Sequence, residues 1–432
     1  MIKKGKIVKS DSGRRIRIEK PVMKKIWDDL GAKWVDSPAV GGTACVYWAT
    51  EMNTTQKGVA KIFKKEFATE DTVKRLRFLV DQGLHLACPI LLAPVETLNE
   101  GDLVGHFTPF ADGKPLENFL REPDSTFSEQ MQLAIALSHA VSVLHARDIA
   151  DGDLHAENLI IERMGNVLRL HVIDLDNFNA PGMPAPPCVG QNLYMAPELR
   201  IAYGKRQPAI PNIGSDLYSL GVLLHEIILL VHPSAGNDDD ESHFQEAMCS
   251  GKWLLDPAAA SQPSGHLGGY PTTILNADLA RLFRSAMSLD PASRPSADLW
   301  ESELSAAFHA IGTCPNPACG APFVIDVSKV ACPLCGKPFP HLTVQMKKHG
   351  GGVLLVQGST VIGRAELGNS PKVSARHAIF RRVGPETWVE SIGRNGTCRW
   401  NGAKWTRLPD GKSLPVQAGD RLRLGDIEVL LN

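Results

Sequence analysis

The sequence lacks the features that would place it in a membrane, in a secretory pathway or on nucleic acid. Its longest apolar stretch, residues 217–231, contains His225 and Glu226 and is too short to span a bilayer. No apolar block follows the basic residues 1–6, so the pattern of a secretory signal is missing. With 46 basic and 47 acidic residues, the net charge of −1 gives no reason to expect nucleic acid or an anionic membrane as a partner. We therefore expect a cytoplasmic protein.

Cysteine is scarce outside one cluster. Five of the nine cysteines are scattered, and four gather within residues 314–335. This is not the pattern of a disulfide framework, which again favours a reducing cytoplasm. The 432 residues are too many for one ordinary domain, and 43% hydrophobic with 22% charged residues is the composition of a globular protein. We expect a multidomain chain.

One segment indicates chemistry. Residues 151–158 read Asp-Gly-Asp-Leu-His-Ala-Glu-Asn, and Asp174 follows Asn158 by sixteen residues. This spacing predicts that Asp153, Asn158 and Asp174 lie on two neighbouring loops. Phosphoryl transfer from ATP needs such a set, because one acid receives the proton of the attacking hydroxyl while an amide and a second acid hold magnesium. Alone, the Asp-x-x-x-x-Asn pattern more often only caps backbone amides in a turn.

Six motifs in order support the chemical interpretation. They are Val-Ala-Lys61, Asp153 with Asn158, Asp174-Leu-Asp, Tyr194-Met-Ala-Pro-Glu198, Ser215-Asp216-Leu-Tyr-Ser-Leu-Gly and Asp290-Pro-Ala-Ser-Arg294-Pro. Through these motifs, residues from about 35 to 308 resemble a eukaryotic-type protein kinase domain. The resemblance implies a bilobal α+β fold.

The resemblance also implies a role for each motif. Lys61 would contact the α- and β-phosphates of ATP. Asp153 would be the catalytic base, while Asn158 and Asp174 would bind Mg²⁺ or Mn²⁺. The loop Ala39-Val-Gly-Gly-Thr-Ala-Cys-Val46 would cover the nucleotide through Gly41, Gly42, Thr43 and Val46. Asp216 would steady the catalytic loop, and Arg294 would pair with Glu198.

Several positions depart from the kinase pattern. The His-Arg pair before the catalytic acid is replaced by Asp151-Gly152, and the lysine two residues beyond that acid is His155. Because histidine is a cation only when protonated, we expect slower or pH-dependent transfer. Residues 69–82 have a helical period, yet they offer no convincing glutamate to pair with Lys61, and the nearest candidate, Glu70, sits early.

The segment Leu175–Leu193 contains no Ser, Thr or Tyr. In many kinases, the arginine before the catalytic acid grips a phosphorylated residue in this segment, and here its position is Gly152. The missing arginine and the missing phosphorylation sites are consistent, because an arginine at this position would have no phosphate to bind. We hypothesise that phosphorylation of this segment does not switch the kinase, so a phosphosite at Tyr194 that changes activity would contradict the hypothesis.

The cysteine cluster has the spacing of a metal site. Cys314 and Cys319 are separated by four residues, and Cys332 and Cys335 by two, each pair on a turn rich in Pro and Gly. Four thiolates suit Zn²⁺, and a site filled by four protein ligands is structural rather than catalytic. We expect a zinc ribbon, although four free thiols or two disulfides would give the same cysteine count.

Short β-type runs separated by Gly and Asn turns fill the C-terminal region and predict an all-β sandwich. The region resembles a forkhead-associated (FHA) domain, which binds phosphothreonine peptides. The matching pieces are Ile362-Gly-Arg364, Val373-Ser-Ala-Arg-His377, Asn395-Gly-Thr397 and Ala418–Gly425. The resemblance implies that Arg364 and Ser374 contact the phosphate, Arg376 adds charge and Asn395 holds the peptide backbone.

These observations predict a chain of several parts. We expect an N-terminal basic strand extension (1–20), a kinase domain (21–310), the zinc ribbon (311–341), a linker (342–352) and the FHA domain (353–432). The function predicted is an ATP- and magnesium-dependent serine/threonine kinase acting on proteins. It resembles a bacterial signalling kinase and is similar to the kinase of the TerY-type phosphorylation triads, in which a phosphatase and a von Willebrand-type protein are partners. The alternatives are a pseudokinase scaffold that binds phosphoproteins, or a small-molecule kinase.

Overall fold

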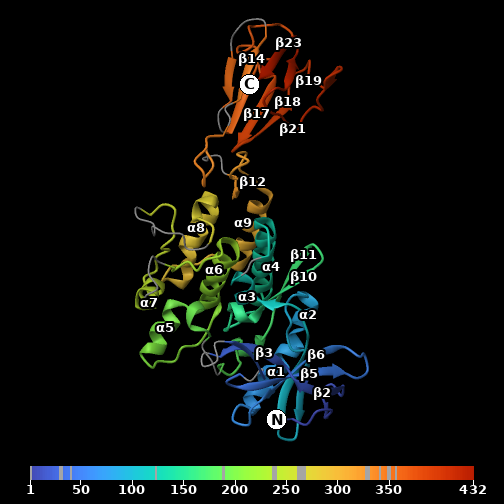
Figure 1. Cartoon of the computed structure of the whole chain (residues 1–432), viewed down its shortest axis with the longest axis vertical. Coiled ribbons are helices and arrows are strands. Elements are labelled where there is room, and N and C mark those ends of the chain that lie inside the picture. Colours follow the sequence, from blue (N-terminus) through green and yellow to red (C-terminus); the bar gives the residue numbers. More distant parts are fainter. Residues whose placement is uncertain are drawn as a thin grey trace. The chain divides into compact units, whose positions relative to one another are not determined.

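The computed structural model describes residues 2–28, 33–38, 41–121, 124–186, 190–235, 241–259, 269–325, 331–339, 342–347, 352–355 and 358–432. The chain divides into two compact units (Figure 1). The first comprises Met1–Tyr270 and Ala280–Ser305, and the second comprises Pro271–Leu279 and Ala306–Asn432.

The first unit opens with an antiparallel sheet in the order β1-β2-β5-β6-β8-β7. Buried residues alternate with more exposed ones along β6, so one face of the sheet packs on an apolar core. That core includes Ile16, Ile18, Ala60 and Phe107. The strands are β1 (Ile7–Lys9), β2 (Arg15–Pro21), β5 (Ala44–Glu51), β6 (Lys57–Phe63), β7 (Glu96–Glu100) and β8 (Leu103–Pro109).

The N-terminal strands correct one expectation. We expected residues 1–20 to form an extension, but β2 is the direct neighbour of β5 in the sheet. Strand β4 (Lys33–Pro38) pairs with β3 (Met23–Asp28) as a separate hairpin. The expected residues Ala39 and Val40 lie outside the described residues.

Helix α1 (Glu70–Gln82) follows the sheet and confirms the predicted helical period. Thr69 caps its N-terminus, since the threonine side chain accepts a hydrogen bond from the amide of Thr72, and Gly83 ends it in the left-handed conformation. Its buried face carries Val73, Leu76 and Leu79, together with an arginine, Arg75.

Helices form most of the remainder of this unit. Helix α4 (Phe127–His145) begins with a capping box between Thr126 and Glu129. Helix α6 is buried along almost all of its length, because neighbouring helices surround it. The helices are α2 (Leu84–Ala87), α3 (Leu116–Arg121), α4 (Phe127–His145), α5 (Pro197–Gly204), α6 (Ile213–Leu229), α7 (Glu241–Cys249), α8 (Ala277–Ala286) and α9 (Ala297–His309).

A small sheet carries the loops of the predicted catalytic residues. Its order is β11-β10-β9, with the strands β9 (Lys114–Pro115), β10 (Leu159–Met164) and β11 (Val167–Val172). Leu159 pairs with Val172, so the loop that ends at Asn158 and the loop that begins at Ile173 leave the same end of this hairpin. The hairpin register therefore explains why two segments sixteen residues apart meet.

The second unit contains a short hairpin followed by a β-sandwich. The hairpin pairs β12 (Ile311–Thr313) with β13 (Pro322–Val324). One sandwich sheet has the order β15-β14-β23-β22-β19-β20 and the other β16-β17-β18-β21, and side chains of both share one core, among them Val344, Phe380, Val389 and Leu422. The strands are β14 (Leu342–Met346), β15 (Gly352–Leu355), β16 (Gly358–Ile362), β17 (Ala378–Val383), β18 (Glu386–Ser391), β19 (Thr397–Trp400), β20 (Trp405–Arg407), β21 (Ser413–Pro415), β22 (Arg421–Leu424) and β23 (Ile427–Leu431).

The linker expected at residues 342–352 is corrected in part. Residues 342–346 form β14, which pairs with β15 and with the final strand β23. The polar and basic composition around Lys347 suggested a linker, but Val344 is buried in the sandwich core. The sandwich thus begins near residue 342, and residues 348–351 lie outside the described residues.

Candidate active site

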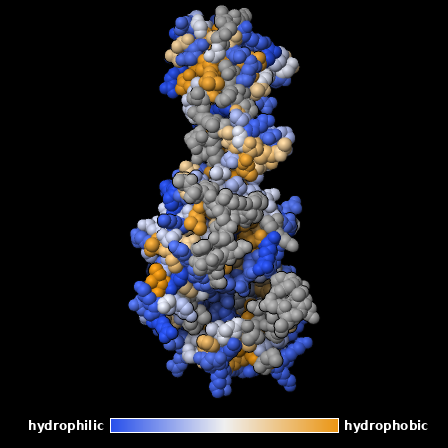
Figure 2. Space-filling model, turned by 60° about the vertical axis from the view of Figure 1, so that its left-hand side comes forward, coloured by the Kyte–Doolittle hydropathy of each residue, from blue (hydrophilic) through white to orange (hydrophobic). Residues whose placement is uncertain are grey.

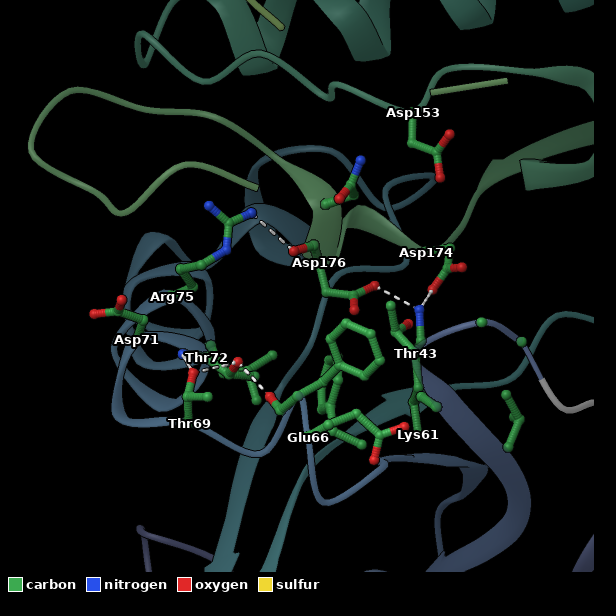
Figure 3. Close-up of a pocket in the computed structure, with 18 of the residues that line it drawn as sticks. Thr43, Lys61, Glu66, Thr69, Asp71, Thr72, Arg75, Asp153, Asp174 and Asp176 are labelled. Carbon is green, nitrogen blue, oxygen red and sulfur yellow. Dashed lines mark hydrogen bonds and ion pairs between the residues drawn. The ribbon is translucent and has the colours of Figure 1, made fainter. Parts of the chain in front are cut away.

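A cavity of about 600 Å³ is lined by seven of the nine residues predicted for catalysis and nucleotide binding. Lys61, Asp153 and Asp174 all line it, as Figure 3 shows. So do the four predicted loop residues Gly41, Gly42, Thr43 and Val46. Neither glycine has a positive φ, and a Cβ added at Gly42 would meet nothing within 4 Å. These glycines therefore leave open space beside the cavity rather than permit a strained turn.

Lys61 lies on β6 between two carboxylates. Its Nζ is 2.5 Å from Oδ1 of Asp174 and 2.9 Å from Oδ1 of Asp176. Burial alone would lower the pKa of Lys61, but Asp176 and Asp174 together raise it, so the ammonium is held charged. Burial raises the pKa of Asp176 to about 7, whereas Lys61 keeps the pKa of Asp174 below its usual value despite burial. Asp174 has a left-handed φ of 64°, a conformation that aspartate tolerates better than most residues.

The catalytic-loop residues form one connected group. The side-chain amide of Asn158 donates to the carbonyl of Asp153 at 3.0 Å, and the Asn158 carbonyl accepts from the amide of Ile173 at 2.9 Å. Asn158 thus ties the loop of Asp153 to the loop of Asp174, although it does not itself line the cavity. Nε2 of His155 lies 3.5 Å from Oδ1 of Asp153, and its Nδ1 accepts from the amide of Glu157. The histidine therefore faces the predicted base rather than the cavity.

Asp216 holds the catalytic loop from α6. Its two carboxylate oxygens accept hydrogen bonds from the amides of Asp151 at 2.6 Å and Gly152 at 3.1 Å. Gly152 has a φ of 76°, and a Cβ at this position would lie 2.8 Å from the carbonyl oxygen of Asn177. Both facts exclude a larger residue without rearrangement. The missing arginine of the kinase pattern thus has a local structural cause.

Asp151 is a buried acid beside other acids. Its Oδ1 accepts from the amide of Asp153 at 3.1 Å, while Oδ2 has no hydrogen-bond partner among the described residues. Burial, followed by the charges of Asp216 and Asp153, raises the pKa of Asp151 well above its usual value. The acid is therefore favoured in its protonated form within the folded protein.

Asp151→Asn is expected to stabilise the folded protein increasingly as the pH rises. The pKa of Asp151 is higher in the folded state than in the unfolded state. The stability that Asp151 contributes to the wild type is therefore fully present at low pH and is lost as the pH rises through the folded-state pKa. The loss is at most about 1.4 kcal/mol per pH unit for one proton. Asparagine has a similar shape and cannot ionise. Thermal melting across pH 4–9 checks this, with Asp148→Asn, an exposed acid, as the control. Parallel wild-type and Asp151→Asn curves would contradict it.

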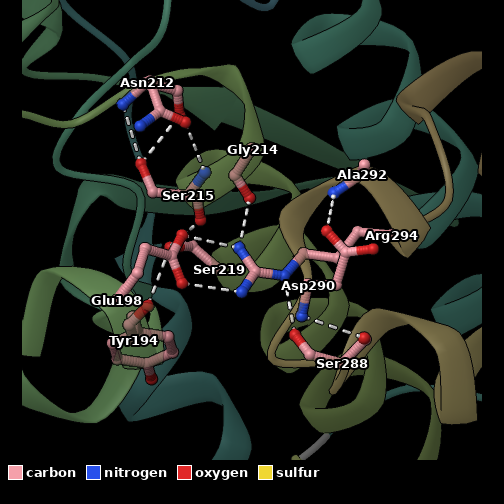
Figure 4. A network of polar contacts seen from close by, with 10 residues as sticks. All are labelled: Tyr194, Glu198, Asn212, Gly214, Ser215, Ser219, Ser288, Asp290, Ala292 and Arg294. Carbon is pink, nitrogen blue, oxygen red and sulfur yellow. Dashed lines mark hydrogen bonds and ion pairs between the residues drawn. The ribbon is translucent and has the colours of Figure 1, made fainter. Parts of the chain in front are cut away.

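A second polar network joins residues 194–198, the start of α6 and residues 288–294 (Figure 4). Arg294, whose side chain is fully buried, donates to both carboxylate oxygens of Glu198 at 2.7 and 2.8 Å. It also donates to the carbonyls of Gly214 and Ser288. The predicted Arg294–Glu198 pair is thus present. It anchors the end of the 175–198 segment to the start of α6.

Tyr194 belongs to the same region and is buried. Its hydroxyl donates to Oε2 of Glu226 at 2.9 Å, and its carbonyl accepts from Ser219. Burial, then the nearby Glu226, raises the pKa of Tyr194. A hydroxyl with these contacts is a poor target for phosphorylation in the folded protein. The geometry agrees with the hypothesis that this segment is not switched by phosphorylation.

The cysteine cluster is assembled as the spacing predicts. The four Sγ atoms of Cys314, Cys319, Cys332 and Cys335 all lie within 4.8 Å of one another. Two of the distances are 3.7 Å (Cys314 to Cys335) and 3.9 Å (Cys319 to Cys332). A tetrahedral Zn²⁺ with bonds of about 2.3 Å places its sulfur ligands roughly 3.8 Å apart. All eight cysteines in the described part of the chain are free of disulfide bonds, so the disulfide alternative is not met there.

The four residues predicted to bind a phosphopeptide lie on connected loops of the sandwich. Nε of Arg364 donates to the carbonyl of Val373, and Ser374 Oγ accepts from the amide of Arg394. The amide group of Asn395 donates to the carbonyl of Lys372 at 2.7 Å. Buried His377 links both loops, since Nδ1 accepts from Ser374 and Nε2 contacts the carbonyl of Gly396. Arg364, Arg376 and Asn395 are exposed and Ser374 is half-buried.

Sequence reasoning missed several residues that line the cavity, among them Asp176 and Arg75. Asp176 contacts Lys61, and Arg75 reaches from α1 to the segment after Asp176. The Asp-Leu-Asp motif contained a signal for the first, because an acid stands where the kinase pattern has glycine. Arg75 could have been noticed as a cation on the apolar face of a helix. Glu70, the candidate partner of Lys61 on the 69–82 helix, is exposed and does not line the cavity.

The surface adds no sign of a membrane span. Among the helices that the structure describes, none combines the length and the apolar character that a bilayer span requires. On the face shown in Figure 2, hydrophilic side chains predominate among the described residues, and the apolar patches are separate.

Comparison with known proteins gives consistent matches. A family model described as "Protein kinase domain" matches residues 40–303, more than half of the chain. The chain is 25% identical over 292 residues to Serine/threonine-protein kinase PknD of Protochlamydia amoebophila (strain UWE25), covering 59% of this chain and 29% of that protein. It is 26% identical over 263 residues to Ribosomal protein S6 kinase alpha-3 of Mus musculus, covering 59% of this chain and 32% of that protein. The chain thus spans about 30% of the length of these curated relatives.

Proposed function

The chain belongs to the protein kinase family, and on this basis we propose that it transfers the γ-phosphate of ATP to serine and threonine hydroxyls of proteins. The observation that carries the proposal is the convergence of Lys61, Asp153 and Asp174 on one cavity of about 600 Å³. A cation, a candidate base and a metal-binding carboxylate are the parts that phosphoryl transfer requires, since catalysis here is mostly positioning and charge stabilisation.

Each residue has a separate task in the proposed mechanism. Lys61 is charged and 14% exposed, so it can contact phosphate oxygens from the floor of the cavity. Asp153 orients the attacking hydroxyl and accepts its proton. His155, 3.5 Å from Asp153, is in position to orient that carboxylate. Asp216 fixes the loop through two backbone amides.

Magnesium fits the donor set. Asp174 contributes a carboxylate that is 37% exposed and lines the cavity. Asn158 contributes an amide on the adjoining loop, and oxygen donors of this kind suit Mg²⁺ better than nitrogen or sulfur. When bound, the ion would neutralise charge on the phosphate oxygens. Asp174 and Asn158 would hold it; Mn²⁺ has similar ligand preferences.

Transfer of labelled phosphate from ATP with magnesium or manganese tests the proposal. The wild type is expected to label a protein substrate or itself, whereas Lys61→Met and Asp153→Asn are expected to be nearly inactive. Equal labelling by all three proteins would overturn the proposal. The rival functions are a pseudokinase scaffold, favoured by Gly152 and His155 at motif positions, and a small-molecule kinase. A wild type that binds nucleotide without transferring phosphate would favour the scaffold.

We also propose that the four cysteines bind one structural Zn²⁺. The closed set of four thiolates supports a structural rather than catalytic ion. About 30 residues cannot supply a hydrophobic core of their own, so the metal would stabilise this segment.

Purified protein is expected to contain one zinc per chain by elemental analysis. Cys332→Ser removes a buried ligand and is expected to lower the zinc content to nearly zero and the melting temperature of the second unit. Cys249→Ser, at a cysteine outside the cluster, is the control. Zinc retained at one equivalent in Cys332→Ser would contradict the proposal.

The C-terminal sandwich is proposed to bind phosphothreonine peptides, because a guanidinium and a hydroxyl are held on linked loops. Phosphothreonine proteins would then be partners of this chain, beside its protein substrates. A phosphatase and a von Willebrand-type protein are the further partners expected if it acts in a TerY-type triad.

Arg364→Ala is expected to weaken binding of a phosphothreonine peptide pool by about 10-fold or more, because one charge-assisted contact to the phosphate is lost. Fluorescence anisotropy measures the affinity. Arg381→Ala is the matched control, since Arg381 is an exposed arginine that pairs with Glu390 on the strands β17 and β18. Equal binding of the unphosphorylated pool, or no effect of Arg364→Ala, would count against the proposal.

A further inference from the structure

Arg75 is a buried arginine on α1 that binds the segment following Asp174. Its guanidinium donates to the carbonyls of Pro184 at 2.6 Å and Asp176 at 3.0 Å, and also to that of Phe178. Three carbonyl oxygens of one segment therefore converge on one fixed, planar cation.

Aromatic contacts add to this attachment. The guanidinium lies 4.4 Å from the ring centroid of Phe178, and that ring stacks on Phe78 of the same helix at 5.4 Å. Arg75 is only 5% exposed, so its charge needs compensation that the carbonyl oxygens and the nearby Asp176 provide. The first residues of the segment are thus held against α1.

The two carboxylates beside Lys61 differ in their surroundings. The side chain of Asp174 is 37% exposed, whereas that of Asp176 is 8% exposed. Figure 3 shows both carboxylates beside Lys61. The more open carboxylate can approach a metal ion and phosphates in the cavity. The enclosed one keeps its contact with Lys61, and its own backbone carbonyl is bound by Arg75.

In other protein kinases, a glutamate on the corresponding helix pairs with this lysine and must be in place for activity. Here the one glutamate of α1, Glu70, is exposed and does not line the cavity, and a cation, Arg75, lies on the buried face of the helix. We propose that Asp176 is the positioning residue of Lys61 and that Arg75 holds Asp176 in place. Helix α1 then acts on Lys61 through the segment that carries Asp176, and not through a carboxylate of its own. The inference rests on the proposed nucleotide-binding function of the cavity.

This arrangement has a consequence for regulation. The contacts of Arg75 and Asp176 need no phosphate group, and Leu175–Leu193 offers no Ser, Thr or Tyr. The contacts among Lys61, Asp176 and Arg75 therefore keep the lysine in position without phosphorylation.

A double-mutant cycle on nucleotide binding tests the pairing. Asp176→Asn is expected to weaken ADP binding about 10-fold, by a similar factor with and without Mg²⁺, because it acts through Lys61. In the background of Lys61→Met, the same change is expected to cost nothing further. Asp174→Asn, by contrast, is expected to weaken binding more strongly with Mg²⁺ than without it, because Asp174 contacts Lys61 and is also a proposed Mg²⁺ ligand. Isothermal titration measures all of these affinities, and melting without nucleotide reports whether each variant is folded.

The matched control is Glu70→Gln, which is expected to leave ADP binding unchanged. Additive losses for Lys61→Met and Asp176→Asn, or an effect of Asp176→Asn seen only with Mg²⁺, would overturn the inference. A lowered affinity in Glu70→Gln would do the same. The cycle measures ADP binding and not phosphoryl transfer. If the wild type binds ADP but transfers no phosphate, the proposed reaction is refuted, while the cycle still tests the pairing of Asp176 with Lys61.

Hydrogen exchange tests the part assigned to Arg75. Arg75→Met is expected to speed amide exchange in residues 176–186 and to weaken ADP binding, since the segment that carries Asp176 is released. Arg77→Met is the control on the same helix, because Arg77 is exposed and pairs with Asp11 instead. Unchanged exchange of residues 176–186 in Arg75→Met would show that the arginine does not hold the segment. If Arg75→Met does not fold, Arg75→Lys, which keeps the charge but loses the fork of donors, is expected to show a smaller effect in the same direction.

Discussion

Asp153→Asn is expected to lower kcat for phosphoryl transfer by about 10²–10⁴-fold while nucleotide affinity stays close to that of the wild type. The carboxylate lines the cavity and is held by its loop, whose amides are bound by Asp216. Asparagine has nearly the same shape but cannot accept the proton of the attacking hydroxyl. The loss should therefore fall on the chemical step and leave binding intact.

Steady-state kinetics with titration of ADP separates the two effects. Asp102→Asn, in the exposed turn between β7 and β8, is the control for removal of one negative charge. Lys61→Met should differ from Asp153→Asn by weakening nucleotide binding as well. If Asp153→Asn retained more than a tenth of the wild-type kcat, the carboxylate would not be the base.

Arg294→Met is expected to destabilise the first unit by about 3–5 kcal/mol, the usual cost of removing one partner from a buried ion pair. The arginine side chain is fully buried and donates to four acceptors, including both oxygens of Glu198. Methionine fills part of the volume but leaves these acceptors without a donor. Chemical denaturation followed by far-ultraviolet circular dichroism measures the change.

A second arginine provides the comparison. Arg284 also makes a two-point contact with a carboxylate, that of Asp256, but its side chain is 46% exposed. Arg284→Met is therefore expected to cost no more than about 1 kcal/mol. Glu198→Gln should be intermediate, because Glu198 is 29% exposed and glutamine keeps one acceptor. Equal costs for Arg294→Met and Arg284→Met would show that burial does not decide the strength of these pairs.

The site could be predicted to the extent that it depends on short segments. The spacing between Asn158 and Asp174 matches one β-hairpin, so the loops at its end had to meet. The four cysteines belong to two tight turns, and their assembly needs few long-range contacts. The start of helix α4 is encoded in the local sequence, because Thr126 and Glu129 form a capping box.

Strand pairing was less predictable. Residues 1–20 were expected to form an extension, but β2 lies beside β5 in the sheet. Residues 342–346, expected to be a linker, belong to the sandwich through β23, which lies more than 80 residues away. Apolar alternation shows that a segment is a strand, but it does not specify which strand is its neighbour, because that depends on packing across the whole sheet.

The sequence by itself determined the order of the motifs, the acids and the cation available for chemistry, and the absence of a hydroxyl in Leu175–Leu193. The tertiary structure alone decided which acid stands beside Lys61 and how Arg75 is used. Both choices depend on burial: Asp176 and Arg75 lie between α1 and the segment after Asp174, where each charge must find a partner from another element. Such partners are set by packing in three dimensions, which the spacing of residues along the chain does not record.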